Sequence, residues 1–174
     1  WDGIFGRGRT LEALLEIQEQ GLAKYIGLTG SDLVLMRDVL AESDVFASVI
    51  TFLKYDLLEQ SAKEILLPTA AERDVAVICA SPLHAGLLGS KRNRWIEEGR
   101  YTHLHAKLEK IEALLAEESG DIPDLGLRYL LSDPRVSMIL TGAATTEELE
   151  ISTAVSDGRH LTTDLISKIE SIDI

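Results

Sequence analysis

The sequence predicts an α/β fold, because helix-like segments alternate with short apolar runs along the chain. This alternation is typical of βα units on a parallel sheet. The run at residues 75–80 is almost entirely apolar, which favours a strand covered on both faces. Strands are expected at residues 23–29, 45–53, 75–80 and 136–140.

Local signals mark the helices between these strands. Thr10 can cap a first helix that Gly21 ends, and Ser31 or Asp32 can cap a second one carrying Leu33, Met36 and Leu40. Asp121 can cap a helix with Pro123 near its first position. Further helices are expected at residues 61–73 (with Pro68 starting or kinking the better-formed part), 103–118, 121–132, 145–155 and 162–172, with a long connection at 81–101.

The length of 174 residues fits a single domain covering 1–174. A full (β/α)8 barrel typically needs about 250 residues. Four parallel strands alone leave two edges of unpaired backbone, which folded proteins normally cover or close. The pattern therefore indicates either a small open sheet or half a barrel, and does not choose between them.

Composition narrows the classes of partner. Lys and Arg number 17 against 29 Asp and Glu, and the net charge of −12 argues against nucleic acid or an anionic membrane as partner. The single Cys79 excludes an intramolecular disulfide, and a cytoplasmic location is expected. No apolar run approaches the roughly 20 residues that span a bilayer. His103 and His105 would diverge on a helix, so no metal site is expected.

Four segments together resemble the aldo-keto reductase family, in the order and spacing that the family shows. Within the family, the sequence looks most like the galactose and threo-aldose 1-dehydrogenase branch. The segments are GLAKYIGLTG at 21–30, YDLLE at 55–59, ICASPLHAGLL at 78–88, and LRYLL at 127–131 continuing through ILTGA at 139–143.

The resemblance implies that this chain is the C-terminal half of a (β/α)8 TIM barrel, with its four strands corresponding to about strands five to eight. It also implies an NAD(P)-dependent oxidoreductase that moves hydride between nicotinamide and an aldehyde, ketone or aldose. The family's catalytic Asp, Tyr, Lys and His belong to the first half of the barrel. No catalytic residue is therefore expected in this chain, and the fragment alone is expected to be inactive.

Candidate cofactor-binding residues cluster after the third and fourth expected strands. Phosphates bind to backbone N–H groups and helix N-termini, and (β/α)8 enzymes commonly build such sites from the last two strand loops. The resemblance implies that the first group wraps the pyrophosphate, although a tight turn stiffened by Pro82 is the alternative. The candidates are Ser81, Leu83 and Gly86 after the third strand, and Gly142, Ala143, Ala144 and Thr145 after the fourth, with Glu148 and Ser152 on the following helix.

The spacing of Thr145 and Glu148 also matches a capping box, a purely structural explanation. Many NADP-using relatives place a basic residue at the positions that match Gly142 or Glu148. An acidic Glu148 would repel a 2′-phosphate but could accept hydrogen bonds from a ribose hydroxyl. NAD is therefore favoured over NADP.

Other positions depart from the commoner family pattern. Thr29 and Gly30 stand where Ser and Asn hold the nicotinamide carboxamide, and Phe52 replaces a Gln that bonds the same group. Ala80 stands where an aromatic ring often stacks on the nicotinamide. Two further changes are Ile151 and Ser152, which replace a Glu-Asn pair near adenine. His84, at a strand end, is the best candidate for contact with a small-molecule carbonyl or sugar substrate.

A second interpretation stays open: a non-catalytic half-barrel that binds dinucleotide or a partner chain. Such a chain would need to cover its open edges, so self-association is possible. A regulatory barrel that senses the redox state of its cofactor is a remoter third. The residues upstream of Trp1 would separate these interpretations.

Overall fold

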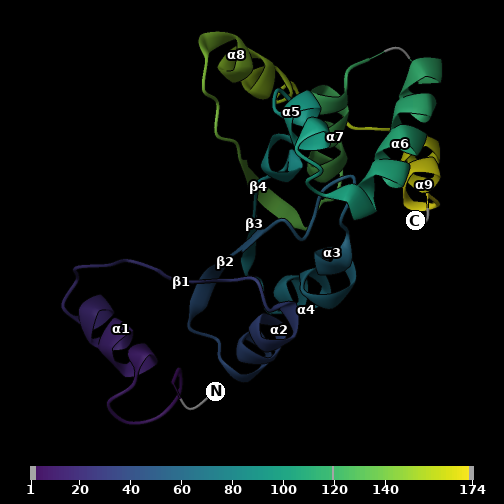
Figure 1. Cartoon of the computed structure of the whole chain (residues 1–174). Helices are drawn as coiled ribbons and strands as arrows, with labels where there is room; N and C mark the ends of the chain where they lie inside the picture. Colours follow the sequence, from purple (N-terminus) through teal and green to yellow (C-terminus); the bar gives the residue numbers. More distant parts are fainter. Residues whose placement is uncertain (1–2, 119, 173–174) are drawn as a thin grey trace.

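The computed structural model describes residues 3–118 and 120–172, and it contains one parallel sheet of four strands (Figure 1). The strands are β1 (Ile26–Gly30), β2 (Phe46–Phe52), β3 (Ala76–Ala80) and β4 (Val136–Leu140), hydrogen-bonded in the order β1-β2-β3-β4. All neighbouring pairs run parallel, so their carboxyl ends lie at the same edge of the sheet. The α/β fold with a parallel sheet is confirmed.

The two faces of the sheet differ in how far they are covered. On one face, Val49, Val77 and Cys79 are buried under helices. In the strand register Phe52 lies beside Ala80, and Ala80 lies beside Leu140. Phe52 and Leu140 are exposed on this second, open face. The expectation that β3 is covered on both faces is therefore wrong for the described residues, because their helices cover only one.

The helices agree with most of the predicted positions. Their bounds are α1 (Thr10–Glu19), α2 (Leu33–Glu42), α3 (Ser61–Ile65), α4 (Leu67–Glu72), α5 (Arg92–Glu97), α6 (His105–Glu118), α7 (Ile122–Leu131), α8 (Thr146–Ala154) and α9 (Thr163–Glu170). The expected helix at 61–73 divides at Leu66, and Pro68 occupies the first turn of α4. On the covered side, α2 contacts β1, α4 contacts β3 and α7 contacts β4.

Of the three caps predicted for α1, α2 and α7, two are confirmed. The Asp32 carboxylate accepts the Leu35 N–H at 3.0 Å, and the Asp121 carboxylate accepts the Asp124 N–H at 2.7 Å. Thr10 is instead the first residue of α1, and Arg9 before it makes no side-chain capping bond. Figure 1 shows α1 set apart from the other helices, near β1.

The long connection after β3 is more ordered than the sequence predicts. It contains a 3-10 turn at His84–Gly86 and the short helix α5, neither of which was expected. Trp95 of α5 is buried, and its indole N–H donates to the Ala85 carbonyl at 3.0 Å. Burial of this one large ring folds the connection back onto the loop that leaves β3.

Candidate functional site

A pocket lies at the carboxyl ends of β3 and β4, where the two following loops face each other. Its volume is about 440 Å³. Ser81 directly follows β3, and Thr141 directly follows β4, so each loop begins at the pocket. Pro123 from α7 and Ile151 from α8 complete its walls. The site is thus built from two strand ends and two helices that are distant in sequence.

Most of the residues predicted to bind a cofactor line this one pocket. They are Ser81, Leu83, Gly86, Gly142, Ala143, Ala144, Glu148 and Ser152. Thr145 is not among the lining residues; it is the N-cap of α8, directly after Ala144. Their meeting is a consequence of the parallel sheet, since the carboxyl ends of neighbouring strands share an edge. Cofactor binding by these residues remains a prediction.

The loop after β3 is tightly wound. Ser81, His84 and Ala85 adopt positive φ, and Gly86 has φ +92°. A Cβ at Gly86 would lie 3.1 Å from the Lys91 side chain, so glycine allows the close approach of Lys91. The Gly86 N–H donates to the Leu83 carbonyl at 2.8 Å. This winding brings Lys91 to the pocket wall.

The loop after β4 leads into the capped N-terminus of α8. The Glu148 N–H donates to the Thr145 hydroxyl at 3.2 Å, and the Glu148 carboxylate accepts the Ala144 N–H at 2.7 Å. The capping interpretation of Thr145 and Glu148 is therefore confirmed. The bond from the Ala144 N–H, and next the Ser90 hydroxyl, lower the pKa of the Glu148 carboxyl. A negative charge of the protein itself thus already occupies one amide of this helix N-terminus.

His84 turns away from the pocket and is not among its lining residues. Its ring is buried, and Nδ1 lies 2.8 Å from an oxygen of the fully buried Asp56. The other Asp56 oxygen accepts the N–H groups of Leu58 and Glu59 at 2.8 and 3.0 Å. His84 therefore ties the loop after β3 to the turn after β2, and this geometry gives no support to its predicted contact with substrate.

Thr29 and Gly30 lie at the end of β1, outside the pocket. Thr29 pairs with Ile50 in the strand register, which places it on the same open face as Phe52 and Ala80. Thr29, Phe52 and Ala80, predicted to lie near the nicotinamide, thus share one face of the sheet. The described residues do not enclose that face. Gly30 pairs with Thr51 on the covered face, where a Cβ would lie 3.1 Å from the Met36 side chain, so its predicted contact is not supported.

Sequence reasoning left several lining residues out of the site, among them Gly89, Ser90 and Lys91. Lys91, Arg92 and Arg94 form a short basic cluster in the long connection. The sequence favours a solvated loop for this cluster, with attraction of a cofactor phosphate as the alternative. The cluster divides in the structure, because Arg92 pairs with Glu112 and Arg94 pairs with Glu98. Only Lys91 of the three lines the pocket. The sequence feature that could have placed Lys91 in the site is its position a few residues after Gly86, because a glycine can reverse the chain.

Within residues 3–118 and 120–172, no group of three or more His, Cys, Asp or Glu side chains is placed to hold a metal ion. The same part of the chain contains no helix with the length and apolar character needed to cross a membrane.

Comparison with known proteins decides the family of this fold and pocket. The model of the aldo/keto reductase family matches residues 1–174. The chain belongs to the aldo/keto reductase family. The resemblance seen in the four sequence segments is therefore confirmed.

Individual relatives agree with this membership. L-galactose dehydrogenase of Arabidopsis thaliana is 26% identical over 169 residues, which cover 94% of this chain and 52% of that protein. The NADH-specific methylglyoxal reductase of Escherichia coli is 26% identical over 159 residues, covering 83% and 47%. The structure of an aldo-keto reductase from Bacillus halodurans in its holo form superposes with a TM-score of 0.75 at 23% identity, covering 95% of this chain and 56% of that one. The chain spans about half the length of the curated relatives it matches.

The pocket of this aldo/keto reductase chain offers exposed main chain and one lysine to a ligand that carries negative charge. The main chain of Gly142, Ala143 and Ala144 is exposed beside it, without bulky side chains. Lys91 adds one positive charge at the wall, while Glu148 adds a negative charge at the helix end. The arrangement can bind and orient such a ligand, and the pocket lining contains no His, Tyr or Cys to act as a proton donor.

Proposed function

We propose that this chain forms about strands five to eight of a (β/α)8 barrel in an NAD-dependent oxidoreductase of the aldo/keto reductase family. The observation that carries the proposal is the single pocket formed by the loops after β3 and β4. The ligand is NAD(H), whose nicotinamide supplies or accepts the hydride. The substrate is a carbonyl compound or an aldose. The catalytic Asp, Tyr, Lys and His come from the remainder of the barrel.

The lining residues fit the parts of a dinucleotide. The N–H groups of Gly142 and Ala143, together with Lys91, bind the linked phosphates. Ile151 and Ser152 on α8 contact the adenosine part. The nicotinamide extends over the open sheet face toward Thr29 and Phe52. In this arrangement the chain binds and orients the cofactor, and the open face becomes the interior of the barrel.

Glu148 supports NAD over NADP in this proposal. Its carboxylate is held at the Ala144 N–H, where a 2′-phosphate would meet both a like charge and an amide already bonded. Like charges brought together at a site disfavour binding and so give specificity. A ribose hydroxyl can instead donate a hydrogen bond to the carboxylate. The name of the Escherichia coli relative, an NADH-specific reductase, points the same way.

Calorimetric titration of the intact protein with NADH, and separately with NADPH, tests this proposal. NADH should bind, and NADPH should bind more weakly. Glu148→Gln should narrow the preference for NADH by about tenfold, the scale of one charge-assisted interaction. Glu150→Gln is the matched control, because Glu150 lies on the same helix but outside the pocket. Failure of both dinucleotides to bind, or equal effects of the two substitutions, would refute the proposal.

A second candidate is a non-catalytic half-barrel that binds dinucleotide or a partner chain. The exposed Phe52, Met138 and Leu140 on the open face favour it, since apolar patches commonly mark an interface. The mass of the intact protein separates the two candidates. A mass matching these 174 residues favours the half-barrel, and one near twice that favours the oxidoreductase.

A further inference from the structure

The helix α8 forms one wall of the pocket but packs weakly against the protein. None of its residues is buried, and Leu149 and Ile151 are exposed. Burial begins only after its last turn, at Val155. Because a helix without a buried face has little to fix it in place, contacts beyond its ends add to the few it makes itself, such as that of the Glu148 carboxylate with the Ser90 hydroxyl.

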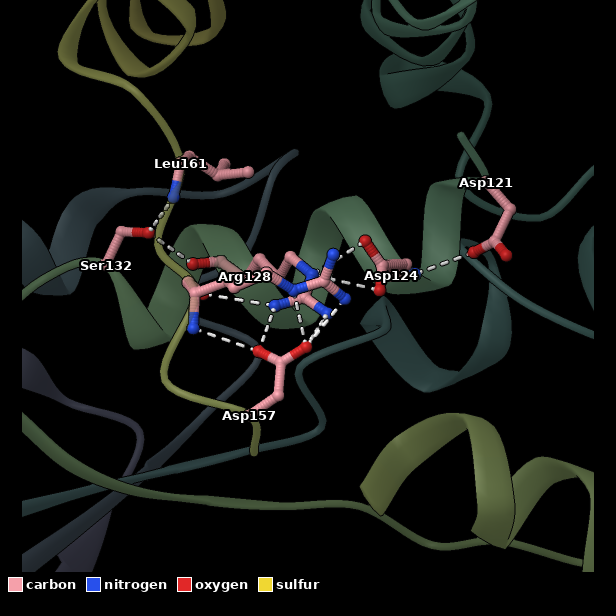
Figure 2. A network of polar contacts seen from close by, with 7 residues as sticks. Asp121, Asp124, Arg128, Ser132, Asp157 and Leu161 are labelled. Atoms are coloured by element: carbon pink, nitrogen blue, oxygen red, sulfur yellow. Dashed lines mark hydrogen bonds and ion pairs between the residues drawn. The ribbon is translucent and has the colours of Figure 1, made fainter. Parts of the chain in front are cut away.

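Arg128 on α7 makes such contacts just beyond the end of α8 (Figure 2). Its Nη1 and Nη2 donate to the two carboxylate oxygens of Asp157 at 2.8 and 3.0 Å. Its Nε donates to both oxygens of Asp124 at 3.0 and 2.9 Å, and Nη1 also donates to the Arg159 carbonyl at 3.1 Å. Arg128, a residue that is 7% exposed, thus joins two carboxylates and one main-chain carbonyl.

Ser132 extends this Arg128 network, which comprises Asp124, Arg128, Ser132 and Asp157. The Ser132 hydroxyl donates to the Arg128 carbonyl at 2.7 Å and accepts the Leu161 N–H at 2.8 Å. The hydrogen bond between Arg128 and Asp157 lowers the pKa of the Asp157 carboxyl and raises the pKa of the Arg128 guanidinium, and it is the largest cause of both shifts. Both groups therefore stay charged. The network therefore fixes the segment 155–161, which follows α8, to the surface of α7.

The two elements joined by the network are also two walls of the pocket. Asp124 directly follows Pro123, which lines the pocket from α7. Asp157 follows α8 closely, and Ile151 and Ser152 line the pocket from its last turns. A bidentate ion pair fixes both the distance and the angle between its partners. Moving Asp157 relative to Asp124 therefore changes the gap between Pro123 and Ser152.

We propose that Arg128 is a positioning residue: through Asp124 and Asp157 it sets the gap between α7 and α8 and so the affinity for the adenosine part of the dinucleotide. The identity of the ligand in this inference rests on the proposed function, whereas the tether between α7 and the segment after α8 does not. Arg128 touches no pocket space itself, since it is absent from the lining residues. Its effect is on binding and not on hydride transfer.

Arg128→Met and Asp157→Asn test the proposal in the intact protein. Amide hydrogen exchange in α8 should become about tenfold faster in both variants, because the opening of a weakly packed element becomes easier when its tether is lost. Affinity for NADH and for ADP should fall about tenfold, the scale of a wall displaced from its ligand. Affinity for nicotinamide mononucleotide should not change. The double variant should lose no more than the worse single variant.

Arg135→Met is the matched control, because Arg135 makes a similar bidentate pair with Asp133 away from the pocket. It should leave α8 exchange and ADP affinity unchanged, and Asp157→Glu should restore most of the loss in Asp157→Asn. If Arg128→Met fails to fold, Asp157→Asn still decides, since Asp157 is partly exposed. Unchanged α8 exchange in both variants, or an equal loss of affinity in Arg135→Met, would overturn the inference. A wild-type protein that binds neither ADP nor NADH overturns the proposed function, while α8 exchange still tests the positioning.

Discussion

The two faces of the sheet carry similar apolar residues but have different surroundings. On the covered face, Val49 and Val77 lie fully buried beneath α2, α4 and α7. On the open face, Phe52, Met138 and Leu140 are exposed. Strands of a parallel sheet are normally apolar on both sides because both sides are covered. The difference shows that both faces carry apolar residues, while the described helices cover only one of them.

The proposed function explains the second face as the interior of the complete barrel. The pocket at the ends of β3 and β4 needs only loops that this chain contains, so its walls come together here. The positions near Thr29 and Phe52 need the opposite strands of a barrel to enclose them. The faces can be compared experimentally through substitutions whose effects should differ in size.

The largest expected effect is at Asp56, in the buried turn that leaves β2. Asp56→Ala removes the acceptor of the Leu58 and Glu59 N–H groups and of His84 Nδ1. Leaving buried polar groups without partners should cost about 3–5 kcal/mol of the free energy of unfolding. Urea denaturation followed by circular dichroism measures this loss. Asp56→Asn, which keeps one acceptor oxygen, should lose less. A loss below about 1 kcal/mol for Asp56→Ala would show that water reaches this turn.

A pair of identical substitutions compares the two faces directly. Leu40 on α2 is 0% exposed, and Leu140 on β4 is 43% exposed. Leu40→Ala should cost about 2–5 kcal/mol, because it leaves a cavity in the core. Leu140→Ala should cost under about 1 kcal/mol in the 174-residue chain. Urea midpoints at equal protein concentration measure both losses. Equal losses would show that something covers the open face, and a concentration dependence would identify a second copy.

The fold was largely predictable because its signals are local. Apolar runs located β1 to β4, and the carboxylates of Asp32 and Asp121 mark helix starts that the structure confirms. The helix α5 was missed because its burial depends on one ring, Trp95, which packs against the loop after β3. A single buried ring produces no helical periodicity in the sequence. Thr10 was misjudged, since a capping residue type does not by itself displace the helix start.

The candidate site was predictable only in part, for a different physical reason. Ser81, Gly86 and Gly142 meet in one pocket because parallel strands end at one edge, a rule that the sequence pattern already implies. The direction of a side chain is not contained in that rule. His84 points to Asp56 instead of the pocket, and Arg128 on α7 reaches Asp157 in the segment after α8. Both contacts join residues far apart in sequence, for which one sequence gives no local signal.

The covered face should also show a pH dependence that the open face lacks. Burial on β3, and next the charge of Asp133, raise the pKa of the Cys79 thiol from 9.0 to about 12. The folded state then keeps a proton that the unfolded state loses above pH 9. Stability is therefore full below pH 9 and is lost as pH rises toward 12, by about 1 kcal/mol between pH 8 and pH 10. Urea midpoints over this range measure the loss, and Cys79→Ala should reduce it.

Tyr55 and Tyr129, whose pKa values burial also raises, add losses of the same sign above pH 10. An identical pH profile for Cys79→Ala would show that the thiol is not shielded from water.

The smallest expected effect is at Phe52, on the open face. Phe52 is 42% exposed at the end of β2, so Phe52→Gln exchanges a ring that already contacts water for an amide that water can solvate. The free energy of unfolding of the 174-residue chain should change by no more than about 0.5 kcal/mol. Val49→Gln on the covered face of the same strand should instead cost at least about 2 kcal/mol, because it buries an amide without a partner. In the complete barrel, the Gln at position 52 would lie beside the nicotinamide and could donate to its carboxamide. A change in NADH affinity in Phe52→Gln, with stability nearly unchanged, would indicate an open face that binds cofactor. An unchanged NADH affinity would favour an open face that binds a partner chain.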